Sequence, residues 1–195
     1  MEKIGEGAEA KIYCAKVYGM DVILKSRGPK AYRLQELDLR IRRQRTKREA
    51  KLMKRAADSG LSVPKIIAVG DTVIFMQMIK GKLLKDTKIT SSKASSIGDL
   101  LAKLHNLGIA HGDFTPANLI SSGKELYLID FGLADSTISS EEKALDMLLM
   151  KRQLEPSLYK QFISGYSKSS KSSREIIARL AEIEERGRYQ SRTLG

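Results

Sequence analysis

The segment that most constrains the fold of this chain is HGDFTPANLI at residues 111–120, which is followed by LIDFG at residues 128–132. Asp113 and Asn118 stand five residues apart among turn-forming residues, and Asp130 follows Asn118 by twelve residues at the end of an apolar run. This arrangement predicts a loop and a strand end that carry two carboxylates and an amide. Oxygen ligands of these kinds suit magnesium.

The spacing of these residues is that of the kinase catalytic loop, H-x-D-x-x-x-x-N, followed by D-F-G. Phosphoryl transfer needs one carboxylate to orient or deprotonate the attacking oxygen, and further oxygen ligands to hold magnesium against the nucleotide phosphates. We therefore predict that Asp113 is the catalytic carboxylate and that Asn118 and Asp130 bind magnesium. Ile120, directly after the loop, is predicted to contact the nucleotide.

The first thirty residues alternate short apolar runs with glycines. This pattern predicts strands over residues 12–18 and 21–25, joined by a turn at Gly19. The two glycines of IGEGAEA would let the backbone approach a phosphate closely. The segment departs from G-x-G-x-x-G because Ala10 replaces the third glycine, and a glycine turn in any hairpin looks the same. The residues of this segment predicted to contact the nucleotide are Ile4, Gly5, Gly7 and Ile12.

A lysine and a glutamate on two predicted elements form a candidate ion pair. Lys25 follows the apolar run VIL, as the kinase lysine follows V-A-I, and Glu49 lies on a helix predicted over residues 32–58. Such a pair would hold the lysine against nucleotide phosphates. Lys25 could instead be a solvated strand-end residue, and Glu49 a surface partner of Arg45 or Lys51. The surrounding motifs favour the pairing, so we predict that both residues belong to the catalytic site.

Residues 66–69 and 72–79 are predicted to form two further strands. In a kinase, the second of these strands leads into the hinge, whose backbone contacts the adenine. We therefore predict that Met76 lines the back of the nucleotide pocket and that Gln77 and Ile79 belong to the hinge. Methionines on such a strand are equally suited to an ordinary core.

The rest of the chain is predicted to be mainly helical. The predicted helices span residues 94–107, 141–154, 156–166 and 173–185. A flexible linker is expected at 167–173, and a basic tail without structure of its own at 186–195.

Two departures from protein kinases carry information. About ten residues separate Asp130 from the next predicted helix, too few for an activation segment and its peptide platform. Gly112 stands where many kinases have an arginine that meets a phosphate on that segment, so we expect no activation of that kind. The sequence thus predicts an α+β, bilobal, protein-kinase-like fold, with an N-lobe at 1–80, a C-lobe at 81–185 and a tail at 186–195.

The composition restricts which binding partners and which cellular location we expect. The net charge of +12 favours an anionic partner such as nucleic acid, although a solvated charged surface explains it equally well. The single cysteine, Cys14, cannot form an internal disulfide, and no apolar run has the length of a membrane span. The beginning MEKIGEGAEA has none of the features of a signal peptide. We therefore expect a cytoplasmic protein without membrane contact.

Over essentially its whole length, the chain resembles the small atypical kinases of the KEOPS complex, a tRNA-modifying assembly of archaea and eukaryotes. The matching segments are IGEGAEA, VILKSRGPKAYRLQELD, RTKREAKL, GLSVPKI, HGDFTPANLI, LIDFGLA, KALDMLL and RGRYQSR. RTKREA and the terminal RGR are the most discriminating. HGDFTPANLI alone would also suit RIO kinases or aminoglycoside phosphotransferases.

The resemblance implies an enzyme that uses ATP and Mg²⁺, hydrolyses ATP or phosphorylates itself, and supports threonylcarbamoyl-adenosine formation on tRNA. It implies that the large lobe and the tail contact a threonylcarbamoyl-transfer subunit, and that the small lobe contacts a small regulatory subunit. The tail from Arg186 onward would reach toward the transfer subunit and tRNA. Asp146 would brace the catalytic loop, unless it is a plain helix acid.

Three other functions remain open at this point. The chain could be a serine/threonine protein kinase that acts on other proteins, or a small-molecule phosphotransferase. It could also be a nucleotide-binding tRNA scaffold without turnover.

Overall fold

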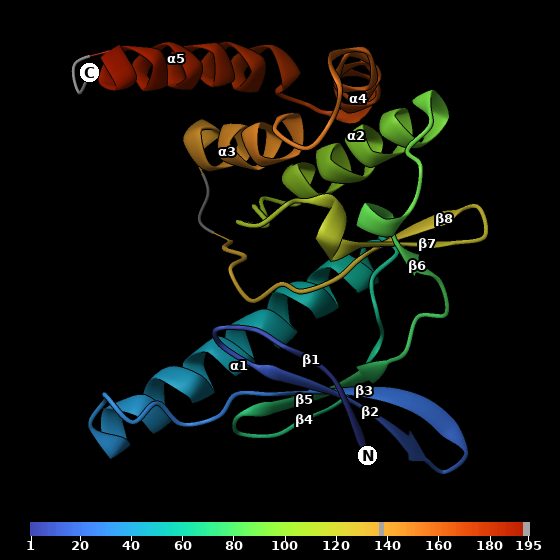
Figure 1. Cartoon of the computed structure of the whole chain (residues 1–195), viewed down its shortest axis with the longest axis vertical. Helices are drawn as coiled ribbons and strands as arrows, with labels where there is room; N and C mark the ends of the chain where they lie inside the picture. Colours follow the sequence, from blue (N-terminus) through green and yellow to red (C-terminus); the bar gives the residue numbers. More distant parts are fainter. Residues whose placement is uncertain (137–138, 193–195) are drawn as a thin grey trace. The chain divides into compact units, whose positions relative to one another are not determined.

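The computed structural model describes residues 1–136 and 139–192 (Figure 1), with side chains as far as residue 187. The chain divides into two units. The first comprises Met1–Gly81 and Tyr127–Gly132, and the second comprises Lys82–Leu126 and the residues from Leu133 onward. No helix in the described ranges combines the length and the apolar content needed to cross a bilayer.

The first unit is built on an antiparallel five-stranded sheet with the strand order β1-β2-β3-β5-β4. In that order, the strands span Glu2–Glu6, Lys11–Val17, Met20–Ser26, Val73–Gln77 and Ile66–Val69. The tight turn between β2 and β3 contains Tyr18 and Gly19, whose φ angles of 48° and 77° suit a hairpin turn. The turn expected at Gly19 is therefore confirmed.

The sequence pattern misses strand β1 because this strand is an exposed edge without alternating apolar residues. Its pairing with β2 shifts register between Lys3 and Gly5, as expected for a bulge at a glycine. The expected strand at 72–79 ends earlier, at Gln77.

Helix α1, Gln35–Asp58, lies against β4 and β5 on one face of the sheet (Figure 1). It begins three residues later than the sequence pattern predicts. At its other end, Gly60 adopts a φ of 83°, and the N–H groups of Gly60 and Leu61 donate to the carbonyl oxygens of Ala57 and Ala56. This is a Schellman cap, which explains why the helix stops where the glycine stands.

The described residues of the second unit form four α-helices and a small sheet of order β6-β7-β8. The helices are α2 (Ser91–Asn106), α3 (Ser140–Lys151), α4 (Pro156–Ser169) and α5 (Ser173–Arg192). The strands are β6 (Lys82–Leu83), β7 (Leu119–Ser122) and β8 (Glu125–Leu128). The last residues of β8 belong to the first unit, where the Leu128 N–H donates to the Ser62 carbonyl oxygen at 2.9 Å.

The basic tail departs from expectation because α5 continues through Arg192 instead of ending near residue 185. The segment contains only one weak helix former, Gly187, and Arg186 is anchored to Glu141 by an ion pair of 2.7 Å. Residues 193–195 of the expected tail lie outside the described residues.

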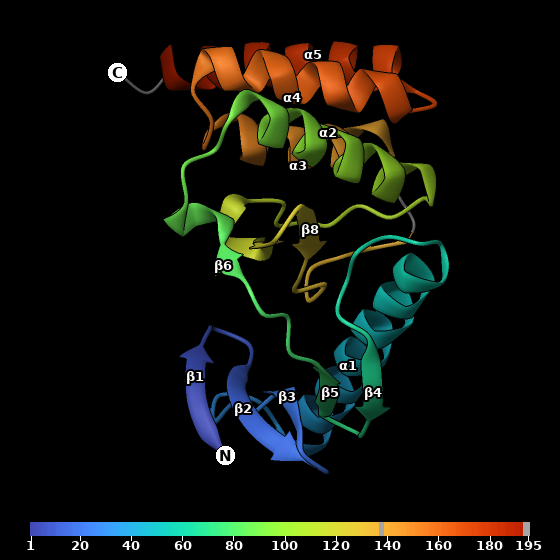
Figure 2. The same ribbon diagram turned by 90° about the vertical axis from the view of Figure 1, so that its right-hand side faces the viewer.

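Helices α2 and α4 form the most extensive helix pair of the second unit and run side by side (Figure 2). Their close approach depends on two glycines. A Cβ atom at Gly98 would lie 2.0 Å from the Phe162 carbonyl oxygen, and one at Gly165 would lie 1.9 Å from the Ser95 carbonyl oxygen. These helices therefore touch through backbone, and any side chain at either glycine would force them apart.

Three buried side chains from α2, α3 and α4 hold the catalytic loop. His105 on α2 places Nδ1 2.8 Å from the Tyr166 hydroxyl and Nε2 3.2 Å from Oδ2 of Asp146. Asp146 on α3 also accepts hydrogen bonds from the backbone N–H groups of His111 and Gly112, at 2.7 and 2.8 Å. The bracing contacts expected for Asp146 are present.

The protonation states of this network follow from burial. Burial lowers the pKa of His105 below 6.5, although the hydrogen bond to Asp146 opposes the shift. Burial raises the pKa of Tyr166 to about 12, so its hydroxyl remains a donor. The neutral imidazole of His105 thus donates from Nε2 to Asp146 and accepts at Nδ1 from Tyr166.

Replacing Gly165 with alanine should lower the free energy of unfolding by about 3 kcal/mol, because the methyl group must displace backbone across the α2–α4 contact. Gly187→Ala in α5 is the matched control. Among the described residues, no atom beyond the neighbouring residues and backbone of α5 lies within 4 Å of its added methyl, so this variant should be unchanged or about 1 kcal/mol more stable. Urea unfolding followed by circular dichroism measures both, and equal stability of the two variants would contradict the tight crossing.

The neutral His105 predicts a pH dependence of stability. Its folded-state pKa is below the unfolded value, so the unfolded chain binds the extra proton as pH falls below about 6.5, and stability declines. One such group contributes a slope of at most about 1.4 kcal/mol per pH unit. His105→Gln should show a shallower decline between pH 7 and pH 5 in urea titrations. Parallel curves for the two proteins would count against a neutral buried histidine.

Candidate functional site

The predicted ion pair between β3 and α1 is present in the first unit. Lys25 Nζ lies 2.8 Å from Glu49 Oε1 and 2.6 Å from Asp130 Oδ1. The side chains of Lys25 and Glu49 are 7% and 1% exposed, so neither alternative, a solvated lysine or a surface glutamate, describes them. The lysine therefore stands between two carboxylates, one buried and one half-exposed.

Sequence reasoning missed a second cation on Glu49. Arg27 Nη2 lies 2.5 Å from Glu49 Oε2, and the Arg27 side chain is 1% exposed. The signal was available in the sequence, because Arg27 is two residues beyond Lys25, and alternate residues of an extended chain lie on the same face.

The backbone at Asp130 is unusual. Its φ angle is 61°, in the left-handed region that residues other than glycine rarely adopt. Its Oδ1 accepts the N–H of Gly132 at 3.0 Å, and a Cβ on Gly132 would lie 2.9 Å from that oxygen. A residue held in this conformation is typical of functional sites. The glycine after Phe131 is thus needed for space beside the carboxylate.

The predicted glycine loop connects β1 to β2. The Gly7 N–H donates to the Ala10 carbonyl oxygen at 2.9 Å, which closes a tight turn. Lys30 Nζ donates to the Ala8 carbonyl oxygen at 2.6 Å, and Glu9 forms an ion pair with Arg45 of α1. The loop is therefore tied to the rest of the unit by two cations, which the sequence pattern alone does not predict.

The remaining predicted nucleotide contacts of the first unit occupy different environments. Ile4 is 51% exposed on β1, and the half-buried Ile12 pairs with Gly5 across the bulge. Met76 is buried on β5, whereas Gln77 is exposed and its N–H donates to the Lys65 carbonyl oxygen at 2.8 Å. That hydrogen bond occupies the Gln77 N–H. Ile79 follows the strand and is half-buried.

In the second unit, Asp113 and Asn118 contact each other directly. Asn118 Nδ2 donates to the backbone oxygen and to Oδ2 of Asp113, both at 2.8 Å. This orientation assigns the donor end of the amide to the loop, so its oxygen is the end suited to a cation. Ile120 is half-buried on β7, where it pairs with Leu83 of β6.

Gly112 is required by the local geometry of the catalytic loop. Its φ angle is 77°, and a Cβ atom there would lie 2.5 Å from the Leu133 carbonyl oxygen. The arginine found at this position in many kinases would not fit this loop. The departure seen in the sequence therefore has a steric cause.

The described residues include no cluster of three or more His, Cys, Asp or Glu side chains that could hold a metal by themselves. This finding fits magnesium, which keeps several waters and is bound through one or two carboxylates plus substrate phosphates. Asn118 offers an amide oxygen and Asp130 a half-exposed carboxylate. Each unit thus contains one oxygen group of a kind that magnesium accepts.

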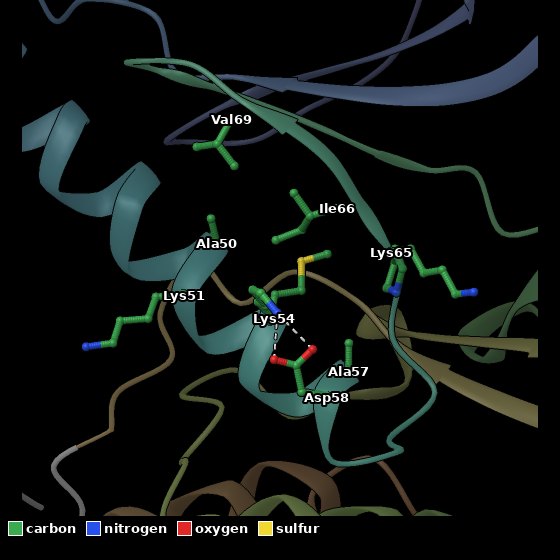
Figure 3. A pocket seen from close by; sticks show the side chains of 10 residues that line it. Ala50, Lys51, Lys54, Ala57, Asp58, Lys65, Ile66 and Val69 are labelled. Atoms are coloured by element: carbon green, nitrogen blue, oxygen red, sulfur yellow. Dashed lines mark hydrogen bonds and ion pairs between the residues drawn. The ribbon is translucent and has the colours of Figure 1, made fainter.

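An open groove of about 760 Å³ lies between α1 and β4 (Figure 3). Ala50, Met53 and Ile66 contribute apolar surface, and Lys54 and Asp58 form an ion pair of 2.7 Å at its edge. None of its lining residues belongs to the predicted nucleotide or metal set.

Comparison with known proteins places this geometry in a family. The RIO domain model matches residues 13–155. The chain is 38% identical to the KEOPS complex subunit Bud32 of Pyrococcus abyssi, over 99% of this chain and 98% of that protein. A probable bifunctional tRNA threonylcarbamoyladenosine biosynthesis protein of Methanobrevibacter smithii is 39% identical over 95% of this chain, which spans only 36% of that relative.

Solved structures agree on the fold. The Rio2 kinase–ADP/Mg²⁺–phosphoaspartate complex of Chaetomium thermophilum matches with a TM-score of 0.68 at 18% identity, over 95% of this chain and 70% of that one. WaaP in complex with acyl carrier protein matches with a TM-score of 0.66 at 12% identity, over 96% and 88%. The expected α+β, protein-kinase-like fold is confirmed, and the chain belongs to the RIO domain family, among the relatives of the KEOPS complex subunit Bud32.

Proposed function

We propose that this chain is an atypical serine/threonine kinase that acts mainly as an ATPase and phosphorylates itself. It does so as a subunit of a KEOPS complex and supports threonylcarbamoyl-adenosine formation on tRNA. The observation that carries the proposal is Lys25, fixed by the buried Glu49 beside the carboxylate of Asp130. The near full-length similarity to a KEOPS subunit supports the assignment of the complex.

Each residue has a proposed task. Lys25 binds nucleotide phosphates, and Glu49 holds it in place. Asp113 orients the attacking water, or a serine hydroxyl during self-phosphorylation. Asn118 and Asp130 are the protein ligands of Mg²⁺, which, when bound, neutralises charge on the phosphates.

The proposed nucleotide contacts complete this set. They are Ile4, Gly5, Gly7, Ile12, Lys25, Met76, Gln77, Ile79 and Ile120. We place the N-lobe at 1–80, the C-lobe at 81–185 and the tail at 186–195.

The proposed partners follow from the family. The C-lobe and tail contact the threonylcarbamoyl-transfer subunit, the N-lobe contacts a small regulatory subunit, and tRNA binds to the assembly in the cytoplasm. The relatives described as bifunctional in threonylcarbamoyladenosine biosynthesis support a link between this kinase type and that modification. The net charge of +12 supports contact with RNA.

One relative is described as a probable serine/threonine-protein kinase, which keeps protein phosphorylation as the second candidate. The chain between Asp130 and the start of α3 at Ser140 argues against it, because so short a segment offers no room for the platform that binds a peptide in protein kinases. Self-phosphorylation and ATP hydrolysis do not need that platform.

Asp113→Ala and Asp130→Ala should each reduce ATP hydrolysis by at least about 100-fold, because a positioned catalytic group contributes about 10²–10⁴ in rate. Phosphate release should be measured with and without the transfer subunit and tRNA. Asp71→Ala is the matched control, since Asp71 is exposed and pairs only with Arg43, which is also exposed, among the described contacts. Full turnover in both aspartate variants would remove the proposed active site.

Deletion of residues 186–195 should weaken tRNA binding and its dependence on salt. The segment carries three arginines, so its loss should reduce the slope of log affinity against log salt concentration by up to about 3. Filter binding over a range of salt concentrations gives this slope. Deletion of 193–195, which removes no charged side chain, is the control; identical slopes for the two truncations would exclude the tail from RNA contact.

A further inference from the structure

The ion-pair cluster around Glu49 contains one more cation than a lysine–glutamate pair. Glu49 offers one negative charge, and its two oxygens are divided between Lys25 at 2.8 Å and Arg27 at 2.5 Å. These three groups therefore carry a net charge of +1. In the structure, Asp130 supplies the balancing charge, since its carboxylate lies 2.6 Å from Lys25.

Arg27 is held in place independently of Lys25. The backbone N–H of Arg27 donates to the Thr72 carbonyl oxygen at 2.9 Å. The backbone carbonyl oxygen of Arg27 accepts from Arg42 Nη1 at 3.2 Å. The side chain is 1% exposed, and within the described part of the chain its Nε and Nη1 atoms have no hydrogen-bond partner. A guanidinium buried in this way is costly to leave unpaired, so Arg27 binds the Glu49 carboxylate firmly.

The two cations of the cluster lie beside Gly132. A Cβ atom on Gly132 would lie 3.4 Å from Lys25 Nζ and 3.5 Å from Arg27 Nη2. The side chains of Lys25, Glu49 and Arg27 are at most 7% exposed, and charges act more strongly where water is excluded.

We propose that Arg27 is a positioning residue that takes up the charge of Glu49 and leaves the charge of Lys25 available to nucleotide phosphates. Arg27 also fixes Glu49 against β3 when Lys25 turns to the phosphates, so the glutamate does not depend on the lysine to stay in place. When Asp130 serves as a metal ligand, the phosphates replace its carboxylate as the anion beside the cluster. This inference rests on the proposed nucleotide site.

Two variants separate the charge of Arg27 from its hydrogen bond. Arg27→Lys keeps a charge and a donor for Glu49, whereas Arg27→Gln keeps only a donor. We expect Arg27→Gln to weaken binding of ADP with Mg²⁺ by about tenfold, since Lys25 alone then balances the charge of Glu49 and has less attraction left for phosphate, and Arg27→Lys to stay within about threefold. Adenosine, which has no phosphate, should bind all three proteins equally. Isothermal titration measures the affinities, and thermal unfolding verifies that each variant is folded.

Two results would overturn the role of Arg27 alone. One is Arg27→Gln binding ADP as tightly as the unmodified protein; the other is both variants losing adenosine and ADP to the same extent, as a purely structural role predicts. Lys25→Met identifies failure of the underlying site. If it binds ADP with Mg²⁺ like the unmodified protein, the nucleotide site itself is wrong, and the inference falls with it. Arg43→Met, at an exposed ion pair, is the control and should change neither affinity.

Discussion

The first unit depends on the two ion pairs formed by the buried carboxylate of Glu49. It lies on α1, yet both of its partners, Lys25 and Arg27, come from the end of β3 and the residue after it. Removing one member of such a buried group leaves an uncompensated charge, which is strongly destabilising. The helix and the sheet are therefore joined by electrostatics at the same place where the proposed chemistry needs a fixed lysine.

In the second unit, the buried carboxylate of Asp146 likewise fixes a proposed active-site residue in place. Asp146 binds two consecutive backbone N–H groups of the catalytic loop and is itself held by His105. The side chain of Asp113 therefore projects from a loop whose backbone cannot rotate freely, and Asn118 fixes it further. Each unit thus uses one buried acid to orient one proposed active-site residue, Lys25 in the first and Asp113 in the second.

The sequence predicts the residues with fixed spacing well, and the residues brought together by tertiary packing less well. The turn at Gly19 follows from a local pattern, and the Lys25–Glu49 pair is predicted from the kinase motifs that surround it. Arg27 is missed because a basic residue after a strand is usually solvated, whereas here it is buried and paired with Glu49 of α1. Strand β1 is missed because an exposed edge strand lacks apolar alternation. The proposed functions of the site residues rest on motifs and family likeness.

The continuation of α5 through Arg192 changes how its end can meet another molecule. A helix rises about 1.5 Å per residue, so the seven residues from Arg186 to Arg192 form a rod about 10 Å long. A helical segment is already ordered before it meets a partner, whereas an unstructured segment loses backbone conformational entropy when it binds. The direction of this rod is also set by the helix that it continues, so a docking partner would meet the end of α5 already in a helical conformation.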